Sequence, residues 1–434
     1  MIEMAIAFAS MLGLMGLGMP VAFAMALVGF VGLLILYNWN WMAAFALLGI
    51  EPFAQSSNYL FVAIPLFVLM GHFTFASGIS SELFAAARAW FGHWRGGLVI
   101  ATIGASGGFA AASGSSLATA GSIGTITIGE MRRNGVHPRI ATAAVAAGGT
   151  LGILIPPSIS MVVYGMIADQ SIGRLLLAGL VPGVLLMVLY MVAVIIMSYL
   201  YPHDLPRQQP VSWGNRMRAT KGVTGITVLT LLVIGGIYGG VFTPTEAAGV
   251  GAVGAFLIVV FRERGINLTT LRKSLHASAN TTVMIFMILI GSHVLNVFLA
   301  ATMGPAQLST WVQSLGLSAY LFLLIVILMY VVLGMFLDAM AMIVLTVPLI
   351  QPIIVGMGFD AIWFGVIVMI VMEMALITPP VGLCVYVVKG VAKDVPLHVI
   401  FSGIWPFLLS MLALVLILTA FPQIVLFLPN MMFN

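Results

Sequence analysis

The sequence predicts an all-α polytopic membrane protein, and three observations support this prediction. Of the 434 residues, 62% are hydrophobic and only 6% are charged, whereas soluble chains carry about 25% charged residues. Apolar stretches of about 20 residues, the length of a bilayer-spanning helix, follow one another along nearly the whole chain. Two proline pairs, Pro156–Pro157 and Pro379–Pro380, interrupt such stretches, where proline removes a backbone donor and breaks a helix. Irregular backbone at membrane depth is tolerated where it lines a cavity within the protein.

The first half of the chain divides into apolar spans, an amphipathic arm, a stretch of small residues and a broken helix. In order, we expect spans at 2–18, 20–37 and 59–77, an arm at 80–95, a small-residue stretch at 97–130, a helix broken at the first proline pair at 139–170, and a span at 174–200. Scaffold helices of this half are expected within 1–58. A polar linker at 202–221 carries Arg207, Arg216, Arg218 and Lys221.

The second half shows the same kinds of segment. In order, we expect spans at 222–242 and 246–261, which make a scaffold segment of 222–261, then a basic amphipathic arm at 262–276, a span at 279–300, a polar piece at 303–316, a long apolar stretch at 318–356, a broken helix at 360–390 and a span at 400–428.

The few basic residues orient these segments, because Lys and Arg concentrate in cytoplasmic loops. Arg95 and Arg132 flank 97–130 on one side, so that stretch should enter the membrane and return as a re-entrant hairpin. The stretch 318–356 has no Lys or Arg at either flank and is interpreted as a hairpin from the opposite side. The prediction is ten spans plus two re-entrant hairpins, with both termini on the outer, periplasmic side.

Charge and cysteine content exclude some classes of protein. The net charge of +4 comes from 16 basic residues spread over loops, too few for an extended nucleic-acid surface, and no nucleic-acid partner is expected. The single cysteine, Cys384, excludes an intrachain disulfide and a cysteine-based metal site. The first basic residue is Arg88, so the N-terminus lacks the basic start of a signal peptide.

A shift of 223 residues superimposes the two halves. It brings 155–157 onto 378–380, Gly135 onto Gly358, and the first hairpin tip, 113–116, onto 336–339. We therefore expect two repeats, 1–221 and 222–434. Each has five spans, an odd number, so the second should be inverted in the membrane. Inverted repeats with paired broken helices point to a secondary transporter with its site near the bilayer midplane.

In this arrangement the hairpin tips and the broken helices offer oxygen ligands for a hard cation, here Na⁺, and helix ends for an anion. The first sodium site is expected from the hairpin tip and the carbonyls before the proline pair: Ser113, Gly114, Ser115, Ser116, Thr119, Ile155 and Pro156. The substrate is expected between the two sites, at Ser115, Pro157, Ser158, Pro380 and Val381. Small residues also permit close helix packing, and this explanation stays open for each serine.

The second sodium site is expected from Phe336, Asp338, Ala339, Thr378, Pro379 and Gly382. Asp338 carries the sharpest signal, because a carboxylate inside a membrane segment is costly and usually functional; its alternative role is a hydrogen bond to a hairpin end. Glu373 is also intramembrane and either couples an ion or proton or braces the broken helix. Glu246 is expected to cap a helix start rather than to bind an ion.

Other ionisable residues give weaker signals. His72 and His293 are intramembrane and could carry protons, although a hydrogen-bonded buried histidine is the commoner case. No arginine follows Arg272, so only Arg174 could reach inward to an anionic substrate. If Arg174 does not reach inward, helix ends and bound Na⁺ must neutralise the charge of an anionic substrate.

Several stretches together resemble the large membrane subunit of tripartite ATP-independent periplasmic (TRAP) transporters. They are "GMPVAFAMALVGF" (18–30), "AIPLFVLMGHFTFASGI" (63–79), "GHWRGGL" (92–98), "SGSSLATAGSIG" (113–124), "GILIPPS" (152–158), "FTPTEAAGVGA" (242–252), "LGMFLDAMAM" (333–342) and "EMALITPPVG" (373–382). They cover nearly the whole chain in the order typical of the family. The residues before the first tip, "GGFAAASGSS", and the loop "GEMRRNGVHP" depart from the family pattern and weaken any inference about the substrate.

The resemblance implies an elevator, in which hairpins, broken helices and substrate move against a scaffold. It implies uptake of an organic acid anion, a carboxylate or a sulfonate, across the bacterial inner membrane, driven by a Na⁺ gradient without other cofactors. It also implies two partners, a periplasmic substrate-binding protein and a small four-span membrane subunit, which here should be a separate polypeptide. The family's sodium-site pattern falls on 113–116, the region of Asp338 and the two proline pairs.

Three alternatives stay open at this point. A divalent-anion/sodium symporter that works alone shares the hairpin and broken-helix design. An intramembrane serine protease would use Ser106 in "GASG" with His293 as its base. An ion channel is the third. The sequence contains no G-x-x-x-x-G-K-[ST] loop for ATP, which argues against a primary pump.

Overall fold

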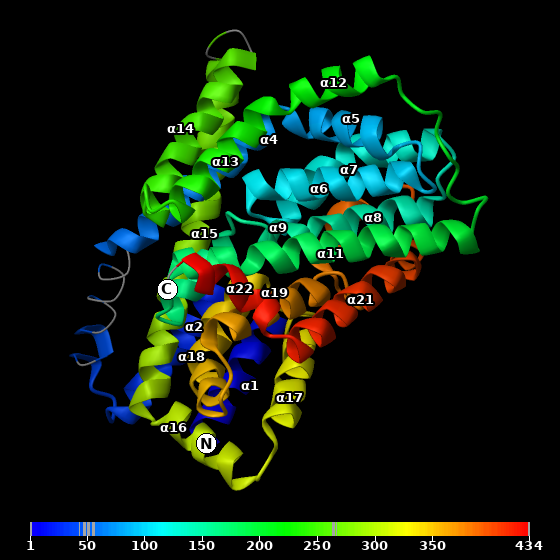
Figure 1. Cartoon of the computed structure of the whole chain (residues 1–434). Coiled ribbons are helices and arrows are strands. Elements are labelled where there is room, and N and C mark those ends of the chain that lie inside the picture. The colour runs from blue at the N-terminus through cyan, green and yellow to red at the C-terminus, as the bar shows by residue number, and fades with distance from the viewer. Residues whose placement is uncertain are drawn as a thin grey trace.

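The computed structural model describes residues 2–42, 44–46, 49, 53, 57–262, 265 and 267–432, and every element in this part of the chain is helical (Figure 1). The first half contains α1 (Ile2–Gly16), α2 (Val21–Leu36), η1 (Tyr59–Val62), α4 (Ala63–Ala76), α5 (Ile79–Phe91), α6 (Gly97–Ser113), α7 (Ser116–Arg133), α8 (Pro138–Gly149), α9 (Leu151–Leu154), α10 (Ile159–Ile167) and α11 (Ile172–Leu200). The second half contains α12 (Trp213–Gly222), α13 (Thr224–Tyr238), α14 (Pro244–Arg262), α15 (Leu268–Ala301), α16 (Gly304–Ser314), α17 (Ala319–Leu333), α18 (Ala339–Gly356), α19 (Ala361–Ala375), α20 (Leu383–Val391), α21 (Leu397–Ala420) and α22 (Gln423–Met432).

Many of these helices are long and apolar enough to cross a bilayer. Six qualify singly among the described residues, and two bent pairs bring the number to eight. One bent pair is the first broken helix, in which 138–154 and 159–167 meet at 43°. The chain is therefore a multi-pass membrane protein. The expected number of ten spans depends on shorter apolar helices such as α1 and α2 and stays a prediction.

The helices are interrupted at the expected positions of both hairpin tips and both breaks, while the re-entrant course of the hairpins stays a prediction. Only Gly114 and Ser115 separate α6 from α7, and residues 334–338 separate α17 from α18. Residues 155–158 interrupt the first broken helix and residues 376–382 the second. In each break the backbone hydrogen-bond ladder stops at a proline pair, as the missing N–H groups require.

Helix bounds recur at the predicted offset. Moving α7 by 223 residues gives 339–356, the bounds of α18, and moving α1 gives 225–239, within one residue of α13. The two glycines paired by this shift, Gly135 and Gly358, both have a positive φ, of 84° and 95°. These bounds agree with the predicted offset, while the repeat itself and the inversion of its second half in the membrane stay predictions.

The helices pack into two groups that meet at the site. In the scaffold group, defined as α2, α4, α13, α14 and α15, α15 packs along α2 and α4, and α14 packs on α4 and α13. The hairpin group, defined as α6–α11 and α17–α21, contains both hairpins and both broken helices. Contacts of α4 with α6 and α10, and of α15 with α18, join the groups. In Figure 1 α13, α14 and α15 lie on the left and α6, α7, α8, α11 and α21 on the right.

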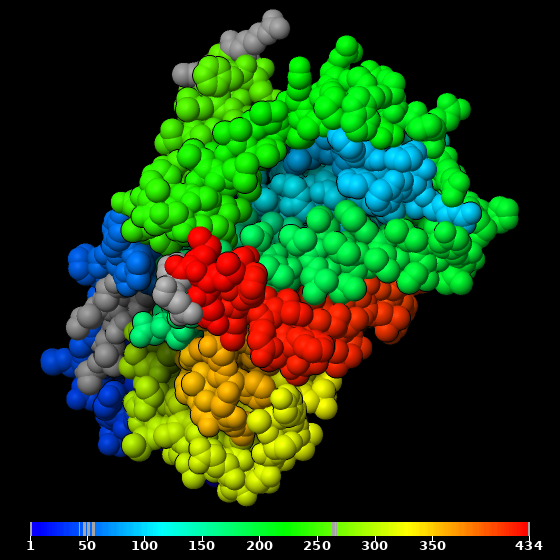
Figure 2. All heavy atoms as spheres, in the orientation of Figure 1, coloured from blue at the N-terminus to red at the C-terminus, as the bar shows by residue number. Residues whose placement is uncertain are grey.

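Three boundaries differ from expectation. The polar linker contains α12, which packs on α5, where the indole N–H of Trp90 donates to the Thr220 hydroxyl at 2.9 Å; Figure 2 shows this green helix lying over the blue one. Residues 268–276 are not a separate arm but the first turns of the 34-residue α15, because no glycine or proline interrupts the helix there. The offset instead pairs the first arm, α5, with α16. The last expected span is divided into α21 and α22 at Pro422.

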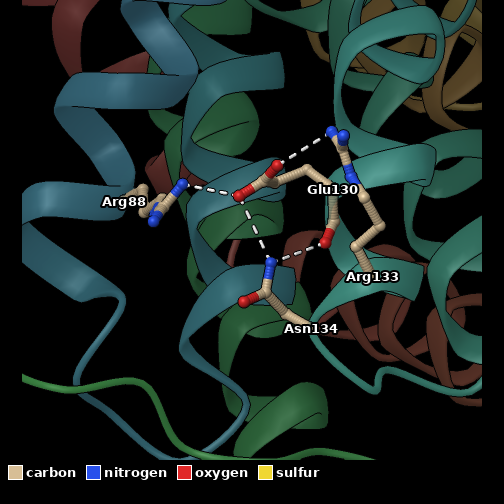
Figure 3. A network of polar contacts seen from close by, with 4 residues as sticks. All are labelled: Arg88, Glu130, Arg133 and Asn134. Atoms are coloured by element: carbon tan, nitrogen blue, oxygen red, sulfur yellow. Dashed lines mark hydrogen bonds and ion pairs between the residues drawn. The ribbon is translucent and has the colours of Figure 1, made fainter.

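The arm α5 is joined to its neighbours by polar contacts (Figure 3). Glu130 of α7 accepts hydrogen bonds from Arg88 of α5 at 2.6 Å and from Arg133 at 3.1 Å, and Asn134 donates to its carboxylate and to its carbonyl. Glu82 of α5 pairs with Arg262 at the end of α14. The arm therefore contacts the hairpin group on one side and the scaffold group on the other.

Glu246 has the capping role that the sequence favoured. Its carboxylate accepts from the backbone N–H of Thr243 at 2.8 Å, and its own N–H donates to the Thr243 hydroxyl at 3.3 Å. This reciprocal pair is a capping box at the start of α14.

Candidate functional site

The tip of the first hairpin lies against the first broken helix. Gly114 has φ of +60°, and a Cβ placed there would come 2.5 Å from the carbonyl oxygen of Pro157. Ser115 is extended and its hydroxyl accepts the N–H of Ala118, which starts α7. A residue with a side chain fits neither the backbone conformation nor the space at position 114.

Hydroxyl groups concentrate just inside this tip. The Ser113 and Thr119 hydroxyls lie 2.9 Å apart, and the Thr119 hydroxyl donates to the carbonyl of Ser115 at 2.8 Å. Ser113 and Thr119 are both buried. Three residues expected at the first sodium site therefore form one connected set of oxygen atoms.

The tip is also linked to the second half of the chain. The hydroxyl of Ser116 donates to Oε1 of Glu373 at 2.6 Å. The side chain of Glu373 is fully buried, and its Oε2 has no hydrogen-bond partner among the described residues. Glu373 thus joins the first hairpin to the second broken helix.

The first break supplies both carbonyls and a helix start. Ile155 is extended before the proline pair, and Ser158 accepts the N–H of Met161 to cap α10. Ile155, Pro156, Pro157 and Ser158 are all buried. The Pro157 carbonyl faces Gly114 of the hairpin tip, so the expected sodium and substrate residues of the first half do lie together.

In the second hairpin Asp338 caps a helix. Its Oδ1 accepts the N–H of Ala341 at 2.7 Å at the start of α18. The side chain is half-buried and lines a cavity. Asp338 therefore combines a structural hydrogen bond with exposure to the cavity.

The second break also contains a proline pair, but the helix after it starts at a glycine and not at a capping serine. The Thr378 hydroxyl donates to the carbonyl of Met374 at 2.6 Å at the end of α19. Gly382, with φ of +61°, starts α20, and a Cβ there would lie 3.1 Å from the ring of Phe401. Thr378, Pro379, Pro380 and Val381 are less deeply buried than their counterparts in the first break.

A cavity of about 620 Å³ lies between the two helix groups. Of the expected site residues, it is lined by Ser113, Gly114, Ser115, Ser116, Asp338 and Ala339. Both hairpin tips therefore face one space. Thr119 joins this set through its hydrogen bonds rather than by lining the cavity.

Other expected site residues do not line this cavity. The proline pairs and Ser158 are not among the lining residues, although Ile153, Ile159, Leu376 and Leu383 line the cavity on either side of the breaks. Phe336 turns its side chain outward and is 67% exposed. Its expected part in the second sodium site would rest on its backbone and stays a prediction.

The cavity also contains residues that sequence reasoning did not place there. Ser122 and Thr125 come from α7, Ser160 from α10, and Thr281 from the scaffold helix α15. His72, noted in the sequence only as a possible proton carrier, lines the cavity from α4 and lies 3.4 Å from the Thr281 hydroxyl. The small polar residues that follow the tip along α7, at a helical spacing, were the signal that could have found Ser122 and Thr125.

Ser106, the nucleophile that the protease alternative requires, does not have the surroundings of a catalytic serine. The Ser106 hydroxyl donates to the carbonyl of Thr102 on its own helix at 2.9 Å and is fully buried. A nucleophile needs a hydrogen-bonded base and access to substrate. Ser106 instead bonds to its own helix and is buried, which argues against the protease alternative.

Two hairpins, two broken helices and a cavity between two helix groups are features typical of a membrane transporter. The family model described as tripartite ATP-independent periplasmic transporter, DctM component, matches residues 8–424. The chain belongs to this family, the large permease component of the transporter.

Curated relatives agree with the family. The chain is 38% identical over 383 residues to a C4-dicarboxylate TRAP transporter large permease protein of Pseudomonas aeruginosa, covering 88% of this chain and 89% of the relative. It is 32% identical to a sialic acid large permease of Vibrio cholerae, covering 97% of each chain. It is 29% identical to an ectoine/5-hydroxyectoine large permease of Ruegeria pomeroyi, covering 98% of this chain and 99% of that one.

A solved structure shares the fold. The crystal structure of the Alcanivorax borkumensis YdaH transporter, described as having an unusual topology, matches with a TM-score of 0.63 at 13% identity. The match covers 88% of this chain and 90% of that one. At this identity the likeness concerns the fold alone.

Proposed function

We propose that this permease takes up a small organic acid anion, a carboxylate or a sulfonate, across the bacterial inner membrane by Na⁺-coupled elevator transport. The observation that carries the proposal is the single cavity faced by both hairpin tips, between the scaffold group and the hairpin group. Movement of the hairpin group against the scaffold would carry this cavity across the membrane.

The oxygen atoms at the tips favour Na⁺ as the coupling ion. Hydroxyls of Ser113, Ser116 and Thr119, carbonyls beside the first proline pair and the Asp338 carboxylate are hard ligands. Hard oxygen ligands suit hard cations. The carboxylate of Asp338 would supply a full negative charge to a second sodium site.

Delivery by partners is the part of the proposal that separates it from a symporter acting alone. The family name and those of the relatives describe tripartite systems, for C4-dicarboxylates, sialic acid and ectoine among others. We propose a periplasmic substrate-binding protein and a small four-span subunit as partners, with both termini periplasmic. Uptake into proteoliposomes that requires added binding protein supports this arrangement, and equal uptake without it favours the stand-alone symporter.

Sodium binding should be visible as stabilisation. A ligand that binds only the folded protein adds RT ln(1 + [L]/Kd), about 1.4 kcal/mol at ten times Kd. We expect the detergent-purified chain with its small subunit to melt at a higher temperature in NaCl than in KCl or choline chloride at equal ionic strength. Asp338→Ala should remove part of this difference.

Asp338→Asn separates the two roles of this residue, because asparagine caps a helix about as well as aspartate but carries no charge. We expect Asp338→Asn to melt like the wild type in KCl and to lose the same part of the sodium response as Asp338→Ala. A full sodium response in Asp338→Asn would limit Asp338 to capping. Equal melting in all three salts would contradict the sodium sites and favour proton coupling.

A further inference from the structure

The cavity carries very little charge. Among the described residues that line it, Asp338 is the one carboxylate and His72 the one imidazole, and none is lysine or arginine. A buried charge without a partner is costly. The number of negative charges that a substrate can bring is therefore limited by this lining.

His72 is held in place from the scaffold side. Its Nε2 lies 3.4 Å from the hydroxyl of Thr281, so α4 and α15 fix the ring between them. The preceding residue, Gly71, packs against the first hairpin tip, where a Cβ would come 2.9 Å from the carbonyl oxygen of Ser113. The ring thus lines the cavity beside the hydroxyl-rich tip, and within the described part of the chain its hydrogen bond to Thr281 uses Nε2 and not Nδ1.

Most of the remaining wall is apolar. It is formed by side chains from both helix groups: Val68, Phe75, Leu117, Met284, Ile285 and Leu376. The volume of about 620 Å³ lies within the range of pockets that enclose drug-sized molecules, roughly 300–1,000 Å³. A small and uniformly polar ligand would leave this wall in contact with water.

We propose that the substrate is a monocarboxylate with a largely apolar body, and that His72 selects it; this inference rests on the proposed function. The carboxylate accepts hydrogen bonds from the tip hydroxyls and from His72, bound Na⁺ neutralises its charge, and the apolar body packs on the wall. A dicarboxylate would bring a second anionic group into a lining that offers no lysine or arginine among the described residues. Selectivity thus differs from that named for the dicarboxylate relatives.

The first experiment compares ligands on the purified chain with its small subunit, in NaCl. The probes are 4-methyl-2-oxopentanoate and phenylpyruvate as apolar monocarboxylates, and succinate and malate as dicarboxylates. We expect the monocarboxylates to raise the melting temperature at concentrations at least about tenfold lower than the dicarboxylates. Stabilisation by dicarboxylates at equal or lower concentration overturns the inference, and so does a lack of response to both monocarboxylates.

The second experiment tests His72 itself. His72→Ala should raise the dissociation constant of the preferred monocarboxylate at least about tenfold and raise KM with little change in kcat, while the sodium response stays. His72→Gln keeps a hydrogen-bonding side chain and should recover most of the affinity. The control is His276→Ala, which removes an exposed histidine from α15, the helix that carries Thr281.

The outcomes also separate this inference from the proposed function. Unchanged affinity in His72→Ala overturns the role of His72. If the protein responds to Na⁺ but prefers dicarboxylates, the proposed function is supported and the monocarboxylate inference is wrong. If the protein responds to neither Na⁺ nor any organic acid, both the proposed function and the monocarboxylate inference are wrong. If His72→Ala fails to fold, as judged by a lost sodium response, affinity in Thr281→Val decides, because this change removes the hydrogen-bond partner of His72. Thr281→Val should bind the monocarboxylate more weakly than the wild type and His276→Ala, and equal binding overturns the role of His72.

Discussion

Gly114→Ala should reduce Na⁺-coupled uptake at least about tenfold. An L-residue in the left-handed region costs roughly 1–2 kcal/mol, and the added Cβ would stand 2.5 Å from the backbone oxygen of Pro157. Backbone cannot yield as the end of a flexible side chain can, so the hairpin tip must move away from the broken helix. A tenfold effect corresponds to about 1.4 kcal/mol, within reach of the strain alone. Uptake into proteoliposomes measures it.

Gly129→Ala is the matched control, because it adds a methyl group to the same hairpin with nothing within 4 Å of the new Cβ. Alanine also favours the helix over glycine by about 1 kcal/mol. Gly129→Ala should transport normally and melt no lower than the wild type. Normal transport by Gly114→Ala would mean that the tip and the break need not touch during the cycle.

Glu373→Ala should destabilise the folded protein by roughly 1–3 kcal/mol, because it leaves the buried Ser116 hydroxyl without its partner. Ser116→Ala should cost a similar amount, since it leaves the carboxyl group unpaired. The double variant should be less destabilised than the sum of the two, because both single changes break one contact. Melting in detergent with the small subunit measures all three.

Glu373→Gln decides between bracing and coupling. Its amide oxygen can still accept from Ser116, so a bracing residue should keep most of its stability and transport, and we expect this result. Loss of transport in a well-folded Glu373→Gln would show that the carboxyl group itself carries the coupling ion or a proton. Ser106→Ala is the control, since it removes another buried hydroxyl of the same hairpin that bonds only to its own helix.

Much of the fold could be predicted because its strongest signals are local. Gly114 and the proline pairs act on backbone conformation at their own positions, so the breaks appeared in the sequence where the structure has them. Apolar length predicted the spans. The polar composition of residues 213–222 hid α12, a helix that packs on α5 and bonds to Trp90. Pro422 could have indicated the end of α21, but the predicted span of 400–428 ran across it.

The site was less predictable because its contacts join distant parts of the chain. Ser116 and Glu373 are 257 residues apart, and His72 and Thr281 are 209 apart. Each pair depends on how the two helix groups meet, which no local pattern records. The hydroxyls of the first tip were found because Ser113, Ser115, Ser116 and Thr119 are neighbours in sequence. The sequence indicated His72 as an intramembrane residue but not its place in the cavity, and it did not indicate Thr281.

The length of α15 gives the cavity a depth in the bilayer. Its 34 residues extend about 51 Å at 1.5 Å per residue, well beyond a hydrocarbon layer of about 30 Å, and tilts rarely exceed about 40°. Its first turns, with Arg272 and Lys273, therefore reach the headgroups. With Lys273 at that boundary, Thr281 lies about 12 Å further along the helix, and therefore within the layer. A substrate beside His72 and Thr281 would thus rest inside the hydrocarbon layer, away from both aqueous phases, and a displacement of the hairpin group would change which aqueous phase it can reach.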